Sequence, residues 1–143
     1  MSEANLEKLQ TPLLILRVTI GVFLLQWGVE KLVMPEYTQM IFKTFYFVEG
    51  LGLPLAYGMG VLQTALAIAI IVGFKTNISY LIGFVIHGLS TLSTIGRLID
   101  PYGPGNHLFM TAVPVLAGMW LLYVMRDADV KLSVDAMRKT ASD

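Results

Sequence analysis

The sequence of 143 residues contains no cysteine. This absence excludes disulfide bonds, thiol catalysis, thiolate-ligated iron–sulfur clusters and cysteine-based zinc sites. The sequence also has no GxGxxG pattern and no P-loop, so we expect no nucleotide cofactor bound by this chain alone. We expect no cofactor bound by this chain alone, apart from a quinone for which the chain could supply a pocket.

Charge is also scarce, because only 14% of the residues are charged and 55% are hydrophobic, with a mean hydropathy of +0.68. A soluble domain carries about 25% charged residues, so this composition indicates an integral membrane protein. Ten basic and ten acidic residues give a formal net charge of zero. We therefore expect a lipid bilayer as the surroundings and no nucleic acid as a partner.

Four apolar runs, at residues 12–34, 55–74, 78–95 and 108–125, each have about the length that crosses a hydrocarbon core. They predict an all-α fold, a bundle of four transmembrane helices in a single domain over residues 1–143. Pro12 is expected in the first turn of the first helix, where its missing N–H costs nothing. No small-residue cleavage site follows the first run, so we expect a retained helix rather than a signal peptide.

The connection at residues 35–54 is aromatic and apolar but is interrupted by Glu36, Lys43 and Glu49. This pattern is typical of a short helix that lies in the membrane interface or re-enters the bundle. Two roles stay open for it, namely an aromatic belt that anchors the protein or a lid over a lateral opening.

Basic residues indicate the orientation. Six of them lie on the side that holds both termini and the turn at 75–77, against three on the other side, which predicts a bacterial-type inner membrane protein with both termini cytoplasmic. The tail after Met125 is expected to be a short amphipathic or frayed end. The six are Lys8, Lys75, Arg126, Lys131, Arg138 and Lys139, and the three are Lys31, Lys43 and Arg97.

Three hydrogen-bonding side chains lie at one depth in three different helices. Gln26, Gln63 and His87 are each eight positions, or ~12 Å, from the expected outer end of their helix. Thr91 shares a polar stripe with His87 on the third helix. The layer has two interpretations: an interhelical hydrogen-bond clamp, or a small polar pocket for a quinone head group or another lipophilic molecule. Gln26 is its weakest member, because the helical wheel places it opposite Arg17.

Arg17 lies inside the first helix, five residues after Pro12. Its side chain either extends to the cytoplasmic phosphates or points at a packed helix face, where it would bind an anionic group. At the other end, Arg97, Asp100 and His107 are expected to be paired rim charges. No metal site is expected, since His87 and His107 lie at different depths and the carboxylates are confined to the helix ends.

Several short motifs resemble the DoxX-like family of small membrane proteins. Residues 16–32 (LRVTIGVFLLQWGVEKL) are similar to its first helix, with an Arg, a Gly and a final Gly-x-x-Lys-Leu. Residues 52–56 (GLPLA), Gln63 and residues 72–76 (VGFKT) are similar to its second helix. The resemblance covers about residues 13–123. The family commonly has Glu where Gln63 stands, and often His-Gly in the region of Gln26, Trp27 and Gly28.

The resemblance implies a four-helix membrane protein whose relatives include a thiosulfate:quinone oxidoreductase subunit, a partner in an oxidoreductase complex and a receptor-assembly chaperone. We hypothesise an accessory or subunit of a quinone-linked oxidoreductase system, with no redox centre of its own and with catalytic residues unknown. The alternative is a non-catalytic assembly factor or structural subunit that docks onto a larger complex. Other membrane subunits or a homo-oligomer are the expected partners. Docking is suggested by the small residues Gly21, Gly28, Gly60, Thr64 and Ala67, which permit close helix approach.

Overall fold

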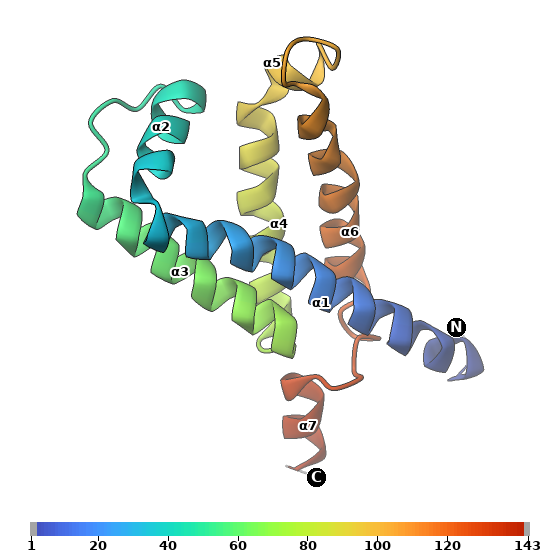
Figure 1. Ribbon diagram of the computed structural model, residues 1–143. Helices are drawn as coiled ribbons and strands as arrows, with labels where there is room; N and C mark the ends of the chain where they lie inside the picture. Colours follow the sequence, from blue (N-terminus) through green and yellow to red (C-terminus); the bar gives the residue numbers. More distant parts are fainter. Residues whose placement is uncertain (1–2, 142–143) are drawn as a thin grey trace.

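The computed structural model describes residues 3–141, in which every regular element is helical (Figure 1). The expected all-α fold is therefore confirmed. A short turn at residues 73–75 joins α3 to α4, whereas longer loops follow α2, α5 and α6. The elements are α1 (Glu3–Val33), α2 (Pro35–Phe45), α3 (Leu53–Val72), α4 (Thr76–Ser93), α5 (Ile95–Leu98), the 3₁₀ helix η1 (His107–Thr111), α6 (Ala112–Val124) and α7 (Val134–Thr140).

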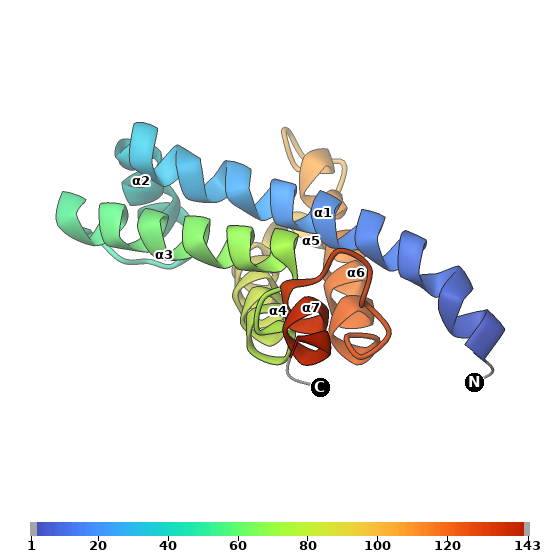
Figure 2. The ribbon, with the colours of Figure 1, turned by 90° about the horizontal axis from the view of Figure 1, so that it is seen from below.

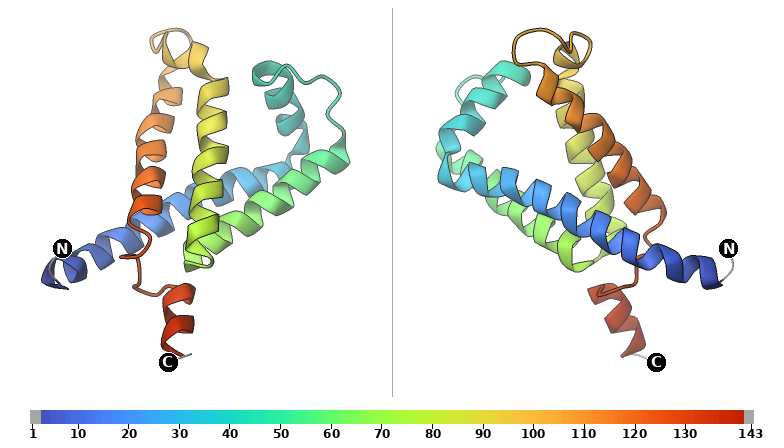
Figure 3. Two further views of the ribbon diagram at one scale, coloured as in Figure 1. Left: turned by 180° about the vertical axis from the view of Figure 1, so that it is seen from behind. Right: turned by 45° about the vertical axis from the view of Figure 1, so that its right-hand side comes forward.

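The four long helices form two antiparallel pairs that are steeply inclined to each other. Helices α1 and α3 lie side by side, and α4 and α6 form the second pair, which is seen nearly end-on in Figure 2. The pairs meet near the turn between α3 and α4 and diverge toward α2 and α5 (Figure 3). The helices therefore do not share one axis, as the simple bundle we expected would. Below, the end with the 73–75 turn is called the proximal end, and the end with α2, α5 and η1 the distal end.

Three segments of the described chain are long and apolar enough to cross a membrane: Ala4–Val33, Leu53–Val72 and His107–Val124. Helix α4 is 18 residues long but is not among them, because its polar stripe lowers its hydropathy. The expectation of four spans is thus supported for three helices. The helix expected within residues 35–54 is present as α2.

Helix α1 begins much earlier than the sequence suggested. It starts at Glu3, so Pro12 lies inside the helix rather than in its first turn. Leu9, before the proline, packs against the hydrophobic core, which gives the preceding turns a tertiary contact. That packing offsets the hydrogen bond that the proline cannot donate.

Small residues bring α1 and α3 into close contact. A Cβ atom added at Gly28 would lie 2.8 Å from the backbone nitrogen of Thr64, and one at Gly21 would lie 3.2 Å from the carbonyl oxygen of Ala67. At Gly60 it would lie 2.7 Å from Leu32 Cδ2. The small residues that suggested docking onto another protein are therefore used inside this chain, and that interpretation of them is wrong.

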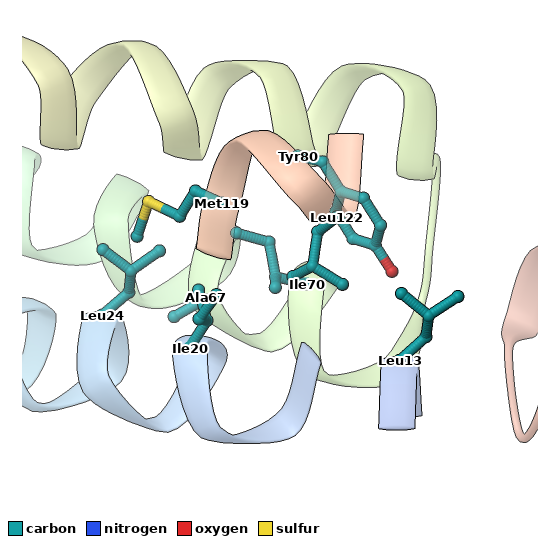
Figure 4. Close-up of a cluster of buried hydrophobic side chains, with 8 residues drawn as sticks. All are labelled: Leu13, Ile20, Leu24, Ala67, Ile70, Tyr80, Met119 and Leu122. Atoms are coloured by element: carbon teal, nitrogen blue, oxygen red, sulfur yellow. The ribbon is translucent and has the colours of Figure 1, made fainter. Parts of the chain in front are cut away.

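The hydrophobic core lies where the two helix pairs meet (Figure 4). Ile20 and Leu24 of α1 face Ala67 and Ile70 of α3 in this cluster. Leu13, Tyr80, Met119 and Leu122 complete it. A space lined by side chains of this cluster has a volume of about 10 Å³, which is no larger than one water molecule requires. That space is too small for a ligand.

Candidate functional site

Gln63 and His87 each join two helices. Gln63 Nε2 donates a hydrogen bond of 3.2 Å to the carbonyl oxygen of Leu24, which ties α3 to α1. His87 Nε2 lies 3.1 Å from the carbonyl oxygen of Ala112, which ties α4 to the start of α6. Both contacts are of the kind expected for an interhelical clamp.

His87 keeps one ring nitrogen available. A carbonyl can only accept, so Nε2 carries the proton toward Ala112 and Nδ1 is left as an acceptor. Within residues 3–141, Nδ1 has no hydrogen-bond partner and is not fully enclosed. The residue is 8% exposed, and its ring packs edge-to-face against Phe23 with 5.6 Å between the ring centroids. His87 thus presents one unused acceptor in apolar surroundings.

Thr91 continues the polar stripe of α4 by one turn. It is buried, and its hydroxyl donates a hydrogen bond of 2.8 Å to the carbonyl oxygen of His87. Because that donor is used within the helix, only the lone pairs of the hydroxyl remain for a ligand.

Gln26 is not brought to this group. Its side chain is exposed, whereas Leu24 and Gly28 on either side of it are buried. Two residues along a helix rotate the side chain by about 200°, so a buried Leu24 turns Gln26 outward. Gln26 therefore faces away from the side of α1 that holds Leu24 and Gly28, and it does not join Gln63 and His87 in one polar layer.

Arg17 is fully buried and has an anionic partner in its own chain. Its Nη1 donates to Asp129 Oδ1 at 2.9 Å, and its Nε donates to the carbonyl oxygen of Ile71 at 3.1 Å. Its Nη2 donates to the carbonyl oxygens of Lys131 and Leu132 at 3.0 and 3.1 Å. The guanidinium is thus satisfied inside the protein, and an extension to lipid phosphates is not what the structure shows.

Tyr80 completes this polar network, because its hydroxyl donates to Asp129 Oδ2. We call Arg17, Tyr80 and Asp129 the proximal triad. The sequence reasoning missed Asp129, which it placed in a frayed tail. A usable signal was present, since an arginine on a packed helix face requires a carboxylate and the sequence of the tail contains four aspartates, among them Asp127, Asp129 and Asp135.

The tail that follows is docked rather than frayed. Ser133 Oγ donates to the carbonyl oxygen of Gly73 at 3.1 Å, and the backbone N–H of Asp135 donates to the same oxygen at 3.1 Å. Gly73 has a left-handed φ of +65°, and an added Cβ would lie 2.9 Å from Arg17 Nη1. Glycine at this position therefore admits both the turn and the triad.

Asp135 caps the start of α4. Its Oδ1 accepts from the N–H of Lys75 at 2.9 Å, and its Oδ2 accepts from the N–H of Thr76 at 2.8 Å. Partial burial alone would raise the pKa of Asp135, but these hydrogen bonds, the Thr76 hydroxyl and the charge of Arg138 together hold that pKa below its ordinary value. The carboxylate is thus stabilised in its charged form.

A polar cleft of about 360 Å³ opens at the distal end, between the end of α2 and the α4–α5 junction. Arg97 does not pair with Asp100 or His107, as we expected for rim charges, but donates from Nη1 to Asn106 Oδ1 at 3.0 Å. We call this space the distal cleft. Its lining residues are Thr44, Phe45, Ser93, Thr94, Gly96, Arg97, Asp100 and Asn106.

In the described part of the chain, no group of three or more His, Asp or Glu residues lies close enough together to bind a metal ion. The candidate polar sites described above are three: the proximal triad, His87 and the distal cleft.

A comparison with known families matches residues 12–94 of this chain to the family described as DoxX. The matched segment runs from Pro12 to Thr94 and so contains Arg17, Gln26, Gln63, His87 and Thr91. No curated protein and no solved structure matches the chain.

Proposed function

Because the chain belongs to the DoxX family, we propose that it is a multi-pass membrane subunit or accessory of a quinone-linked oxidoreductase system. It binds a quinone-type head group beside His87 and supplies no redox centre of its own. The observation that carries this proposal is the free Nδ1 acceptor of a histidine whose other nitrogen is already fixed. A hydroquinone hydroxyl is a donor of the matching kind.

The surroundings of His87 suit a lipophilic ring. Phe23 already packs on the imidazole with edge-to-face geometry, and aromatic rings favour such neighbours. The exposed side chains of the same helix, including Val85, Ile86 and Leu89, are apolar and would lie among lipid tails. A prenyl tail would meet the same apolar surface.

We further propose that α4 is the fourth membrane span. Helices α3 and α6 are both candidate spans, and both run from the distal to the proximal end. The chain must therefore return to the distal end between them, and α4 is the helix that makes this crossing (Figure 1). Its 18 residues correspond to about 27 Å, close to the thickness of a hydrocarbon core. With four spans, the excess of basic residues at the proximal end favours cytoplasmic termini in an inner membrane.

Binding of a hydroquinone analogue, which carries the hydroxyl donor, to the purified protein in nanodiscs tests the site, with two matched substitutions. His87→Gln keeps an amide N–H near the position of Nε2 but removes the Nδ1 acceptor, so it should weaken binding about fivefold, or ~1 kcal/mol. His87→Asn keeps a polar atom near Nδ1 and loses the contact to Ala112. Gln26→Ala, on the outward face of α1, is the control. Unchanged binding in His87→Gln would contradict the site.

The subunit or accessory role is tested by extraction in a mild detergent. A stoichiometric partner that carries a flavin, haem or iron–sulfur centre should co-purify, since this chain has no cysteine and the proposal assigns the redox chemistry elsewhere. A chain recovered alone or only with copies of itself would count against the role. A stoichiometric partner with no redox centre would favour the assembly-factor alternative.

A further inference from the structure

The distal cleft lies where a membrane surface would be. Apolar side chains close in sequence to its lining residues are strongly exposed: Leu92 is 65%, Ile99 is 77% and Leu108 is 75% exposed. In a bilayer these side chains would enter the acyl region, and the polar lining would lie at the level of the head groups. A ligand in the cleft would then approach from the membrane interface.

Arg97 is positioned on the wall of this cleft. Its Nη1 is fixed by Asn106, which is 4% exposed and whose Nδ2 donates to the carbonyl oxygen of Asp100 at 2.9 Å. Within residues 3–141, no partner occupies Nε or Nη2 of Arg97. A guanidinium held at one nitrogen, with further N–H groups unused, matches the geometry of a phosphate.

Asp100 provides the opposite charge in the same cleft. Its carboxylate lies against Gly103, where an added Cβ would meet Asp100 Oδ2, yet it has no ion-pair partner in the described part of the chain and does not reach Arg97. The hydroxyls of Thr44, Ser93 and Thr94 add neutral polar groups. The cleft therefore offers one positive and one negative charge that do not neutralise each other directly.

We propose that the distal cleft binds the head group of phosphatidylethanolamine, with the phosphate on Arg97 and the primary ammonium on Asp100. Its volume of about 360 Å³ is at the small end of ligand sites, which suits a head group better than a whole lipid. Phosphatidylcholine carries the same charges but has no ammonium N–H to donate to Asp100. Phosphatidylglycerol has no cation at all. This site is separate from the one proposed at His87.

Native mass spectrometry of the full chain tests this proposal, with equal amounts of phosphatidylethanolamine, phosphatidylcholine and phosphatidylglycerol added to the detergent micelles. The wild-type protein should retain phosphatidylethanolamine about tenfold better than either other lipid, the effect of one charge-assisted hydrogen bond. Arg97→Gln should lower retention of all three lipids by a similar factor. Asp100→Asn should abolish only the preference for phosphatidylethanolamine over phosphatidylcholine.

Matched controls separate binding from folding. Lys43→Gln also removes a positive charge at the distal end, but Lys43 does not line the cleft and pairs with Glu49 in the open, so retention should equal that of the wild type. Asp100→Asn keeps the backbone carbonyl that holds Asn106, so this variant should fold even where Arg97→Gln does not.

Three outcomes would overturn the proposal. The first is equal retention of the three lipids by the wild type, and the second is a preference for phosphatidylethanolamine that persists in Asp100→Asn. The third is binding of free phosphoethanolamine with no retained lipid, which would assign the cleft to a soluble zwitterion instead of a membrane lipid.

Discussion

At the scale of single residues, Arg17 shows how a membrane helix accommodates a charge. An arginine inside a span is costly unless it is paired, and here a carboxylate and three carbonyl oxygens surround it. Asp129 comes from a segment more than one hundred residues later in the sequence, which is why no local pattern reveals it. The residue type predicted that a partner was needed, whereas the fold supplied it.

Asp129→Asn should destabilise the protein by about 3 kcal/mol, because it leaves the buried guanidinium without a counter-charge. The measurement is the free energy of unfolding in detergent micelles. Asp127→Asn, an exposed neighbour on the same segment, should change it by no more than about 0.5 kcal/mol. If the two variants unfold alike, the ion pair does not stabilise the fold.

At the scale of elements, the C-terminal segment joins α1, the 73–75 turn and α4. Asp129 bonds Arg17, Ser133 bonds Gly73, and Asp135 caps α4. Helix α7 itself has only seven residues, too few to be stable alone. Its position therefore depends on the contacts made by the residues before it and by Asp135.

Acid should release this segment. The pKa of Asp135 in the folded protein lies below its unfolded value, so its contribution is complete above about pH 4. It is lost as the pH falls below that value and through the folded pKa. The protection of the amides of residues 131–141 against hydrogen exchange, relative to the intrinsic exchange rate at each pH, should therefore fall below about pH 4.

The control for this effect is Asp135→Asn, which lacks the titrating group. In this variant the exchange of residues 131–141 should already be faster at neutral pH and should show a weaker change on acidification. An identical pH profile in the two proteins would mean that another group controls the docking of the segment.

At the scale of the whole molecule, the two crossed helix pairs separate the polar groups along the direction from the proximal to the distal end. The pairs converge at the proximal end, where the triad is fully enclosed, and diverge toward the distal end, where the cleft is open. His87 lies between these two regions, on the helix that links them. Enclosure thus decreases from the proximal to the distal end.

Labelling of single cysteines tests the proposed topology, and the natural absence of cysteine makes the background silent. In cells whose inner membrane is intact and whose outer membrane, where present, has been made permeable, an impermeant maleimide should label Tyr102→Cys at the distal end. Lys8→Cys and Lys75→Cys, at the proximal end, should react only after the inner membrane is opened. Labelling of Lys75 and Tyr102 from the same side would exclude α4 as a membrane span.

The sequence alone predicted the type and the position of most helices, but it predicted the direction of polar side chains less well. Low charge and long apolar runs established an all-helical membrane protein, and the spacing of α3, α4 and the short turn between them was correct to within a few residues. The inward direction of Gln63 and His87 was readable, since each contacts a backbone carbonyl of another helix. The direction of Gln26 was not, because it faces outward. Periodicity predicts a face only when the partner helices are known.

Only the tertiary structure decided which groups meet. It paired Arg17 with Asp129, used the small residues of α1 and α3 to pack those helices together, and left Arg97 and Asp100 unpaired in one cleft. The physical reason is that apolar burial depends on composition and period, which are local, whereas an ion pair or a close approach depends on distances between segments far apart in the chain. The sequence thus determined that this protein lies in a membrane, and the fold decided where its polar chemistry is placed.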